Sequence, residues 1–205
     1  MSGIVVVDYG MGNLHSVRRK LRDAGAHSVL TQDPAVVATA EKLVLPGVGH
    51  FAEAMRTLES SGLREALDGA VRRRGAPILG ICLGMQLFAA HSEEGDAAGL
   101  GWIAADVVRF RVSDPIRFKV PHIGWNDVQA AKESDLTRGL EARAEFYFVH
   151  AYHLACHDPS DVLLKTTYDY EFPSAVAREN VYGVQFHPEK SHDAGLALLR
   201  RFAAI

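Results

Sequence analysis

The sequence has little cysteine. Cys82 and Cys156 are its only two, and they lie far apart with no C-x-x-C pair. A disulfide framework or a redox pair is therefore not indicated. The sequence also lacks a large excess of charge of one sign, because its 22 Lys and Arg residues nearly balance its 25 Asp and Glu residues. This balance gives no sign of nucleic acid or an anionic membrane as the main partner, so we expect a small neutral or zwitterionic substrate.

Long apolar stretches are also lacking. The longest uncharged stretch, residues 76–90, is shorter than the ~20 apolar residues that a membrane-spanning helix needs. A strand-like segment begins at Ile4, with no signal-peptide pattern before it. We therefore expect a cytoplasmic protein with reduced thiols and no membrane segment. The length fits one α/β domain over residues 1–205.

Alternating strand and helix patterns fill the first half of the chain. Strands are predicted over 4–8, 27–30, 42–46 and 78–81, and helices over 13–24, from Asp33-Pro34 onward, and over 52–59, 63–74 and 83–90. This alternation predicts an open, mostly parallel, doubly wound sheet.

The pattern changes in the second half. After a flexible polar loop over 91–99, strand patterns over 102–112, 116–123 and 125–130 predict a hairpin-rich antiparallel insertion that covers the site. A short helical turn is predicted over 134–140, strands over 145–152, 162–168, 174–178 and 181–186, and a terminal helix over 193–203.

Cys82 stands at a strand-to-helix junction, in Gly80-Ile-Cys82-Leu-Gly84. Small residues on both sides of a central nucleophile are typical of a nucleophile elbow, a sharp turn that exposes one side chain. A thiol at the start of a helix is expected to be stabilised as the thiolate. The alternative is a buried structural cysteine, a common place for a free thiol.

Two glycine-rich turns follow earlier strands. In Gly47-Val48-Gly49 the glycines leave the N–H of Val48 easy to aim, so this residue is the natural second donor to an oxyanion at Cys82. Tyr9-Gly-Met-Gly12-Asn13 suggests a dinucleotide site, but the third glycine of that fingerprint is absent. We therefore interpret the second stretch as a tight turn.

His187 and Glu189 supply a base and the carboxylate that orients it. In an extended segment the two side chains lie on the same side, with Pro188 fixing the backbone between them. A charged turn before a helix is the alternative. The charged-turn alternative is weakened because a candidate nucleophile needs both a base and a carboxylate that orients it.

Other polar residues are interpreted as structural. His150, His153 and His157 suggest a metal, but positions three apart in a strand face opposite sides, so His150 and His153 should not converge. No metal site is predicted. Cys156 is interpreted as a structural thiol. Four cationic side chains are expected on exposed strand faces: Arg109, Arg111, Arg117 and Lys119.

Three stretches together resemble the class I, triad-type glutamine amidotransferases: Pro46-Gly-Val-Gly49, Gly80-Ile-Cys82-Leu-Gly-Met-Gln86 and Gly183-Val-Gln-Phe-His187-Pro-Glu189. The resemblance implies a flavodoxin-like fold. Within that class, the stretches 8–16, 45–51, 123–126 and 146–152 look like the glutaminase subunits of imidazole glycerol-phosphate synthase. One departure is Lys190-Ser191-His192, where a second serine is expected, and it casts doubt only on partner contacts.

The resemblance implies a mechanism and a set of site residues. Cys82, His187 and Glu189 would form the catalytic triad, and the N–H groups of Leu83 and Val48 the oxyanion hole. Four further positions match residues that hold or surround the substrate: Gly49, Gln86, His150 and Tyr152. Six match partner-facing residues: Gly10, Asn13, Trp125, Asn126, Tyr147 and Lys190.

The same resemblance implies glutamine as substrate, no cofactor, and a separate (β/α)8-barrel cyclase that receives the ammonia in histidine biosynthesis. Two alternatives remain. One is another enzyme on the same scaffold, such as the glutaminase of vitamin B6 synthesis or a cysteine peptidase, against which Pro46-Gly-Val-Gly49 argues. The other is a non-catalytic, flavodoxin-like binding module.

Overall fold

A large sheet forms the middle of the protein in the computed structural model, which describes residues 3–205. Its parallel part has the order β2-β1-β3-β4-β14 and consists of β1 (Ile4–Val7), β2 (Ser28–Thr31), β3 (Leu43–Gly47), β4 (Ile78–Cys82) and β14 (Val181–Val184). Three antiparallel strands extend it beyond β14: β13 (Tyr170–Arg178), β12 (Val162–Tyr168) and β9 (Gln129–Ala130). The predicted open, mostly parallel sheet is confirmed.

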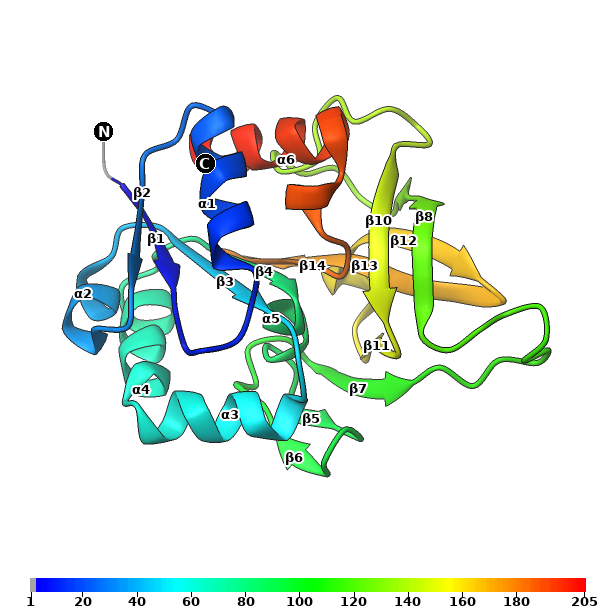
Figure 1. Ribbon diagram of the computed structural model, residues 1–205, viewed down its shortest axis with the longest axis horizontal. Coiled ribbons are helices and arrows are strands. Elements are labelled where there is room, and N and C mark those ends of the chain that lie inside the picture. The colour runs from blue at the N-terminus through cyan, green and yellow to red at the C-terminus, as the bar shows by residue number, and fades with distance from the viewer. Residues whose placement is uncertain (1–2) are drawn as a thin grey trace.

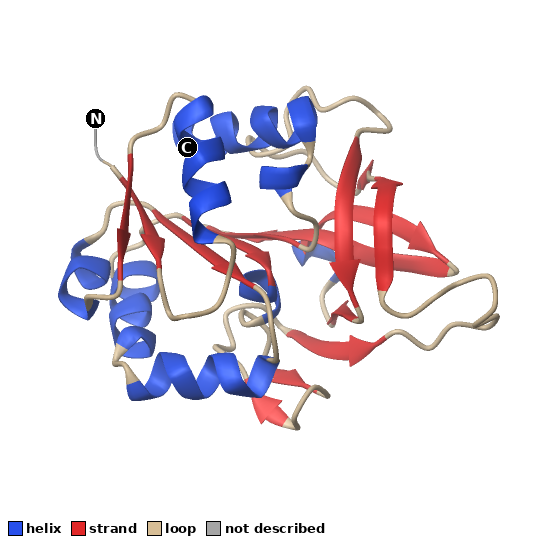
Figure 2. Cartoon of the chain, viewed as in Figure 1, coloured by secondary structure: helices blue, strands red, loops and turns tan. Residues whose placement is uncertain are grey.

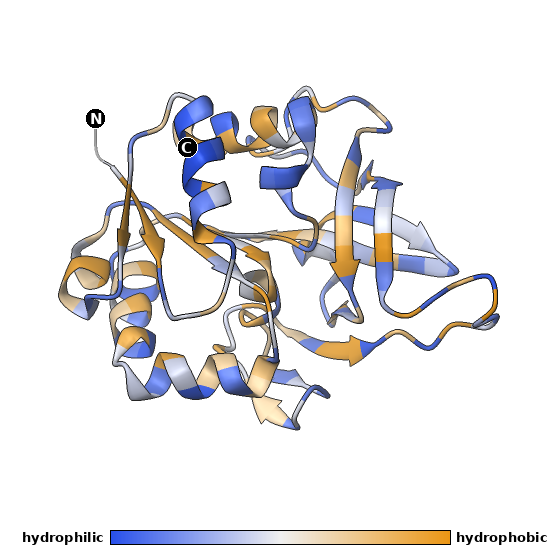
Figure 3. Ribbon diagram, viewed as in Figure 1, coloured by the Kyte–Doolittle hydropathy of each residue, from blue (hydrophilic) through white to orange (hydrophobic). Residues whose placement is uncertain are grey.

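Helices cover both faces of this sheet (Figures 1 and 2). On one face lie α1 (Leu14–Asp23) and α6 (His192–Ala204), and on the other α2 (Pro34–Thr39), α3 (Phe51–Ser60), α4 (Leu63–Asp68) and a π-helical turn (Gly69–Arg73). Asp33 caps α2 as predicted, its carboxylate accepting from the N–H of Ala35. The parallel strands are apolar along their length, because both faces are buried (Figure 3).

The second half of the chain is mostly antiparallel, as predicted, but it is not rich in hairpins, because the strands within residues 102–130 pair with later strands and not with one another. One small sheet, in the order β11-β7-β5-β6, contains β5 (His91–Ser92), β6 (Ala97–Ala98), β7 (Ala105–Arg109) and β11 (Tyr152–Cys156). The other is an antiparallel ribbon of β8 (His122–Asp127) and β10 (Glu145–His150). We call the second one the β8–β10 ribbon.

Three local predictions are wrong. The helix predicted over 83–90 is shorter and comprises only α5 (Leu83–Gln86). The backbone groups of residues 87–90 form hydrogen bonds with those of residues 99–105 instead. The predicted polar loop over 91–99 holds the β5–β6 hairpin. Residues 116–121 are a turn and a loop, stabilised by the Asp114 carboxylate accepting from two backbone N–H groups.

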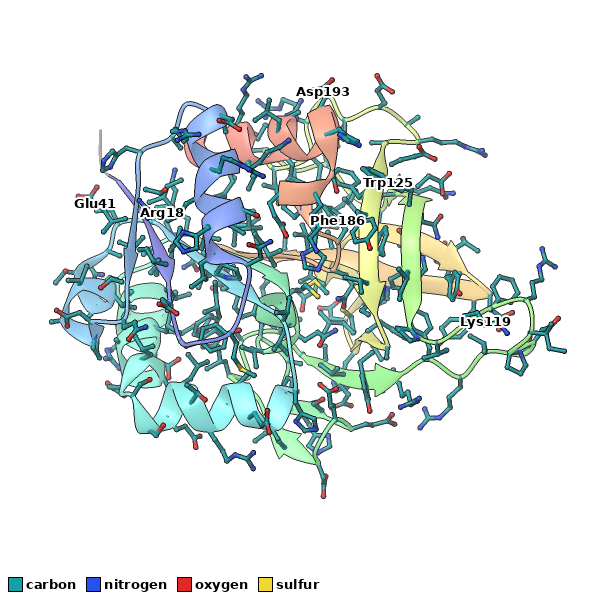
Figure 4. All side chains as sticks on the ribbon, in the orientation of Figure 1. Arg18, Glu41, Lys119, Trp125, Phe186 and Asp193 are labelled. Carbon is teal, nitrogen blue, oxygen red and sulfur yellow. The ribbon has the colours of Figure 1, made fainter. Side chains whose placement is uncertain are left out.

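The cationic side chains of the insertion are exposed, as predicted, but only Arg109 lies on a strand, whereas Arg111, Arg117 and Lys119 lie in the turn and loop that follow it. Lys119 lies on the loop that connects β7 to β8 (Figure 4). Among residues 3–205, no helix combines the length and the apolar character needed to cross a bilayer.

Candidate active site

The turn at Cys82 has the geometry predicted for a nucleophile elbow. β4 ends at Cys82 and α5 begins at the next residue, with Cys82 at φ 56° and ψ −112°. A Cβ on Gly84 would collide with the carbonyl oxygen of Leu45, and one on Gly80 would lie 2.7 Å from the carbonyl oxygen of Gly84. The two glycines are therefore required for the close passage of β3, β4 and α5. Positive φ at a non-glycine residue is strained and is often found at functional sites.

His187 and Glu189 are joined as predicted. Nδ1 of His187 lies 2.7 Å from Oε1 of Glu189, and the two side chains are 3% and 2% exposed. His187 follows β14 and opens a short 3-10 turn, Pro188–Lys190. Phe186, which precedes it, is fully buried near the middle of the molecule (Figure 4). Because β14 pairs with β4 in parallel, the histidine emerges beside the end of the cysteine strand.

The electrostatics of His187 favour a charged imidazolium. Burial lowers the pKa of His187, but Cys82 and Glu189 together outweigh burial and raise it to about 9. Both a hydrogen bond and a charge interaction with Cys82 contribute to this raised pKa. This arrangement suits a thiolate beside an imidazolium, which a carboxylate orients.

The candidate oxyanion residues lie opposite each other. Gly47 is the register partner of Cys82 between β3 and β4, so Val48 follows on the side of Leu83. The β1–α1 loop packs along this segment. A Cβ on Gly47 would collide with the Tyr9 hydroxyl, and one on Gly49 would lie 2.8 Å from the end of the Met11 side chain.

A cavity of about 310 Å³ opens at Cys82. It brings together all the predicted oxyanion and substrate residues, and its lining is Val48, Gly49, Cys82, Leu83, Gln86, Glu94, Pro121, Val149, His150, Ala151 and Tyr152. Larger surface hollows, of about 320 to 860 Å³, contain none of the triad. The smaller cavity is therefore the one placed for chemistry.

Sequence reasoning missed two residues of this site. Gln185 donates from Nε2 to Sγ of Cys82 at 3.6 Å, and its Oε1 accepts from Nε2 of Gln86 at 2.9 Å. Glu94 lines the cavity and accepts from the first N–H of α3, on Phe51, at 2.8 Å. Gln185 lies two residues before His187, where strand alternation would have placed it on the same face. No sequence signal indicated Glu94, since it lies in the segment predicted to be a loop.

His150 lines the cavity, but both of its ring nitrogens are engaged within the protein. Nδ1 lies 2.8 Å from the Tyr152 carbonyl oxygen, and Nε2 lies 3.1 Å from Nδ1 of His122. The expectation that His150 and His153 face apart is wrong, because the chain bends at Ala151 between β10 and β11. Both rings pack against Phe110, with centroids 5.2 and 4.6 Å away.

The candidate partner-facing residues lie in two places. On the outer face of the β8–β10 ribbon, Trp125 packs against Tyr147 at 6.0 Å and stacks on His192 at 4.9 Å, and the Lys190 ammonium lies 5.4 Å from the centre of the Tyr147 ring. Gly10 and Asn13 are exposed on the β1–α1 loop. The Asn126 amide instead points inward, donating to the carbonyl oxygen of Thr167.

The remaining predicted features concern thiols and metals. Burial and the nearby Asp161 and Asp158 raise the pKa of Cys156 to about 12, which fits an unreactive structural thiol. Across residues 3–205, no three His, Cys, Asp or Glu side chains gather as they would around a metal ion.

Comparison with known proteins identifies the family. Residues 5–204 match the family model described as glutamine amidotransferase class-I. Imidazole glycerol phosphate synthase subunit HisH 2 of Methanococcus maripaludis is 45% identical over 97% of this chain and 98% of its own, and the subunit of the same name from Pseudomonas aeruginosa is 46% identical over 98% and 99%. The structure of PurLQS from Thermotoga maritima shares the fold, with a TM-score of 0.73, 19% identity, and 98% coverage of each chain. The chain therefore belongs to the class I glutamine amidotransferases, among the HisH subunits of imidazole glycerol phosphate synthase.

Proposed function

We propose that this chain is the glutaminase subunit of an imidazole glycerol phosphate synthase and hydrolyses glutamine to glutamate and ammonia. One observation carries the proposal. In a chain 45% identical to a HisH subunit, Cys82 on a strained elbow lines a cavity that suits an amino acid, and the imidazole of the buried His187–Glu189 pair interacts with that cysteine. The reaction needs no cofactor.

The chemistry follows from the three side chains. The Cys82 thiolate attacks the side-chain amide carbon of glutamine, and the imidazolium of His187 protonates the nitrogen that leaves as ammonia. A γ-glutamyl thioester remains on Cys82. His187, held by Glu189, then removes a proton from water, and the resulting hydroxide attacks the thioester to release glutamate.

Two backbone N–H groups stabilise the oxyanion in this proposal. Leu83 follows the nucleophile in the elbow, and Val48 lies across from it at the end of β3. Donors aimed at the developing charge are worth more than those that only bind the substrate, because they act in the transition state.

The amino-acid end of glutamine is held at the opposite side of the cavity. The Glu94 carboxylate suits the α-ammonium group, while Gln86 offers an amide beside it. Gly49, His150 and Tyr152 complete the wall. His150 acts by shape and by its neighbours, since its ring nitrogens are already bonded.

A partner subunit receives the ammonia. Protonation in bulk water would remove its nucleophilicity, so an enclosed route to a second active site is required. The outer face of the β8–β10 ribbon exposes large apolar side chains, with Ile123 at 60% and Trp125 at 45% exposure, as an interface would. We propose a (β/α)8-barrel cyclase as this partner, in the cytoplasm.

The Cys82→Ser variant tests the proposal. It changes one atom, so the complex with the cyclase should form and accept added ammonium salt at the wild-type rate. Glutamine-dependent synthesis should be lost, because the alcohol is almost never ionised at neutral pH. Cys156→Ser should behave as the wild type. Wild-type glutamine turnover by Cys82→Ser would show that Cys82 is not the nucleophile.

A further inference from the structure

A line of buried hydrogen bonds runs outward from the nucleophile. Its inner half consists of amides. Gln185 donates to Sγ of Cys82 at 3.6 Å, and Nε2 of Gln86 donates at 2.9 Å both to Oε1 of Gln185 and to the carbonyl oxygen of Tyr152. The donor that faces the sulfur is therefore held in place by a second amide and a backbone carbonyl.

The outer half consists of two imidazoles. Nδ1 of His150 lies 2.8 Å from the Tyr152 carbonyl oxygen and must carry the proton, because a carbonyl only accepts. In a neutral ring, Nε2 is then the acceptor. Nδ1 of His122, 3.1 Å away, therefore donates to it, and Nε2 of His122 accepts from the Asn126 amide at 3.4 Å.

Burial keeps both rings neutral. The ring of His122 is stacked between those of Phe148 and Tyr168, with centroids at 5.0 and 4.1 Å, and its residue is 3% exposed. Burial lowers the pKa of His122 to about 4 and that of His150 well below its usual range. The directions of the hydrogen bonds are therefore fixed at neutral pH.

We propose that His122 is a positioning residue for glutamine hydrolysis, an inference that rests on the function proposed above. Its Nδ1–H fixes the ring of His150, which shares the Tyr152 carbonyl with Gln86. A shift of that ring moves Gln86 and, through it, the Gln185 amide that contacts the nucleophile. Asn126, which donates to His122, follows the exposed Trp125 in β8. A partner docked on the β8–β10 ribbon therefore acts on the hydrogen bond between Asn126 and His122.

Two variants distinguish the contribution of the His122 N–H donor from that of the packed ring. His122→Phe keeps an aromatic ring between its neighbours and removes the donor, whereas His122→Asn loses the ring but keeps an N–H near the position of Nδ1. Both are compared with the wild type in the complex with the cyclase. We expect kcat for glutamine to fall about tenfold to a hundredfold in His122→Phe and to be largely retained in His122→Asn, with the ammonia-dependent rate unchanged in both.

The reverse order of activities would indicate that His122 acts only by packing. A packing role predicts that the smaller asparagine is worse, so His122→Phe equal to or more active than His122→Asn overturns the proposal. If the wild-type complex itself failed to hydrolyse glutamine, the function proposed above would be wrong instead.

A second measurement needs no variant. The ¹⁵N shifts of the imidazoles in the full wild-type chain report which nitrogen carries the proton. We expect His122 and His150 both to be neutral and protonated at Nδ1 at pH 7. An Nε2–H form or an imidazolium at either residue would overturn the proposal, even if His122→Phe does not fold.

Discussion

The carboxylate of Glu189 lies 2.7 Å from Nδ1 of His187, and this buried pair interacts with Cys82 through the imidazole. Glu189→Gln keeps the shape but removes the charge that stabilises the imidazolium. We expect kcat for glutamine in the cyclase complex to fall by about 10²–10⁴, the scale seen when such a carboxylate becomes an amide. Glu179→Gln, at an exposed surface pair, is the control. Unchanged turnover in Glu189→Gln would remove the carboxylate from the mechanism.

Val48 supplies the proposed second donor to the oxyanion. Val48→Pro deletes its N–H, whereas Val48→Ala keeps it and removes only exposed methyl groups, since Val48 is 43% exposed. Cyclase-stimulated glutamine hydrolysis should fall by about 10²–10³ in Val48→Pro and stay near the wild-type rate in Val48→Ala. The ammonia-dependent reaction should be the same in both. Equal stimulated rates would place the donor elsewhere.

Control by the partner is expected at the same segment. We infer that the isolated subunit mostly holds the Val48 N–H averted and that the cyclase with its bound nucleotide favours the aimed state. The β1–α1 loop gives a physical link, because Met11 and Tyr9 pack on the glycines that flank Val48. A coupling of about 3 kcal/mol would change the rate by roughly a hundredfold.

The glycine after the elbow should tolerate no side chain. Gly84→Ala places a Cβ against the carbonyl oxygen of Leu45, which is backbone of a buried central strand and cannot move away. The variant should lose about 3 kcal/mol or more of its free energy of unfolding in urea titrations. Gly3→Ala is the matched control, because its Cβ would meet the His27 side chain at 3.2 Å and the His27 carbonyl oxygen only at an ordinary contact distance of 3.7 Å. Equal stability of the two variants would show that β3 and α5 can separate.

Buried histidines make the stability depend on pH in two directions. Burial lowers the pKa values of His122, to about 4, and of His150 and His153. Their contribution is present above the unfolded value of about 6.5 and is lost as the pH falls through the folded values. His187 has the opposite sign. Its raised pKa of about 9 stabilises the fold fully below about 6.5 and less as the pH rises through 9.

Urea unfolding between pH 4 and pH 9 measures these terms. The free energy of unfolding should fall on the acid side by up to about 1.4 kcal/mol per pH unit for each neutral buried histidine, and His122→Phe should make that slope shallower. His15→Gln, at an exposed position on α1, should leave the slope unchanged. A slope that His122→Phe does not alter would mean that the ring is already charged in the folded protein.

Much of the fold could be predicted from the sequence. The buried parallel strands are continuous apolar runs, and helix starts such as Asp33-Pro34 carry their own capping signals, so both are local. The end of α5 could not be predicted, because residues 87–90 look helical, whereas their backbone groups form hydrogen bonds with residues 99–105. Local propensity is overridden there by tertiary pairing.

The residues of the site likewise divide into those that a local motif indicates and those that depend on distant contacts. Cys82, His187 and Glu189 lie in short motifs that are typical of a mechanism, so the sequence alone identified them as candidates. Gln185 and Glu94 act through contacts with residues that are distant in the chain. The bend at Ala151, which gathers His150 and His153 on one aromatic cluster, has no turn signal of its own.

In the β8–β10 ribbon, His122 and His150 are buried, whereas Ile123 and Trp125 on the other face are exposed. In a strand, neighbouring side chains point to opposite faces and contact different surroundings. Natural selection can therefore replace the outward residues one at a time, and so follow a changing partner, while the inward residues that reach the nucleophile stay as they are. Descendants of one ancestral glutaminase could exchange partners in this way without passing through an inactive enzyme.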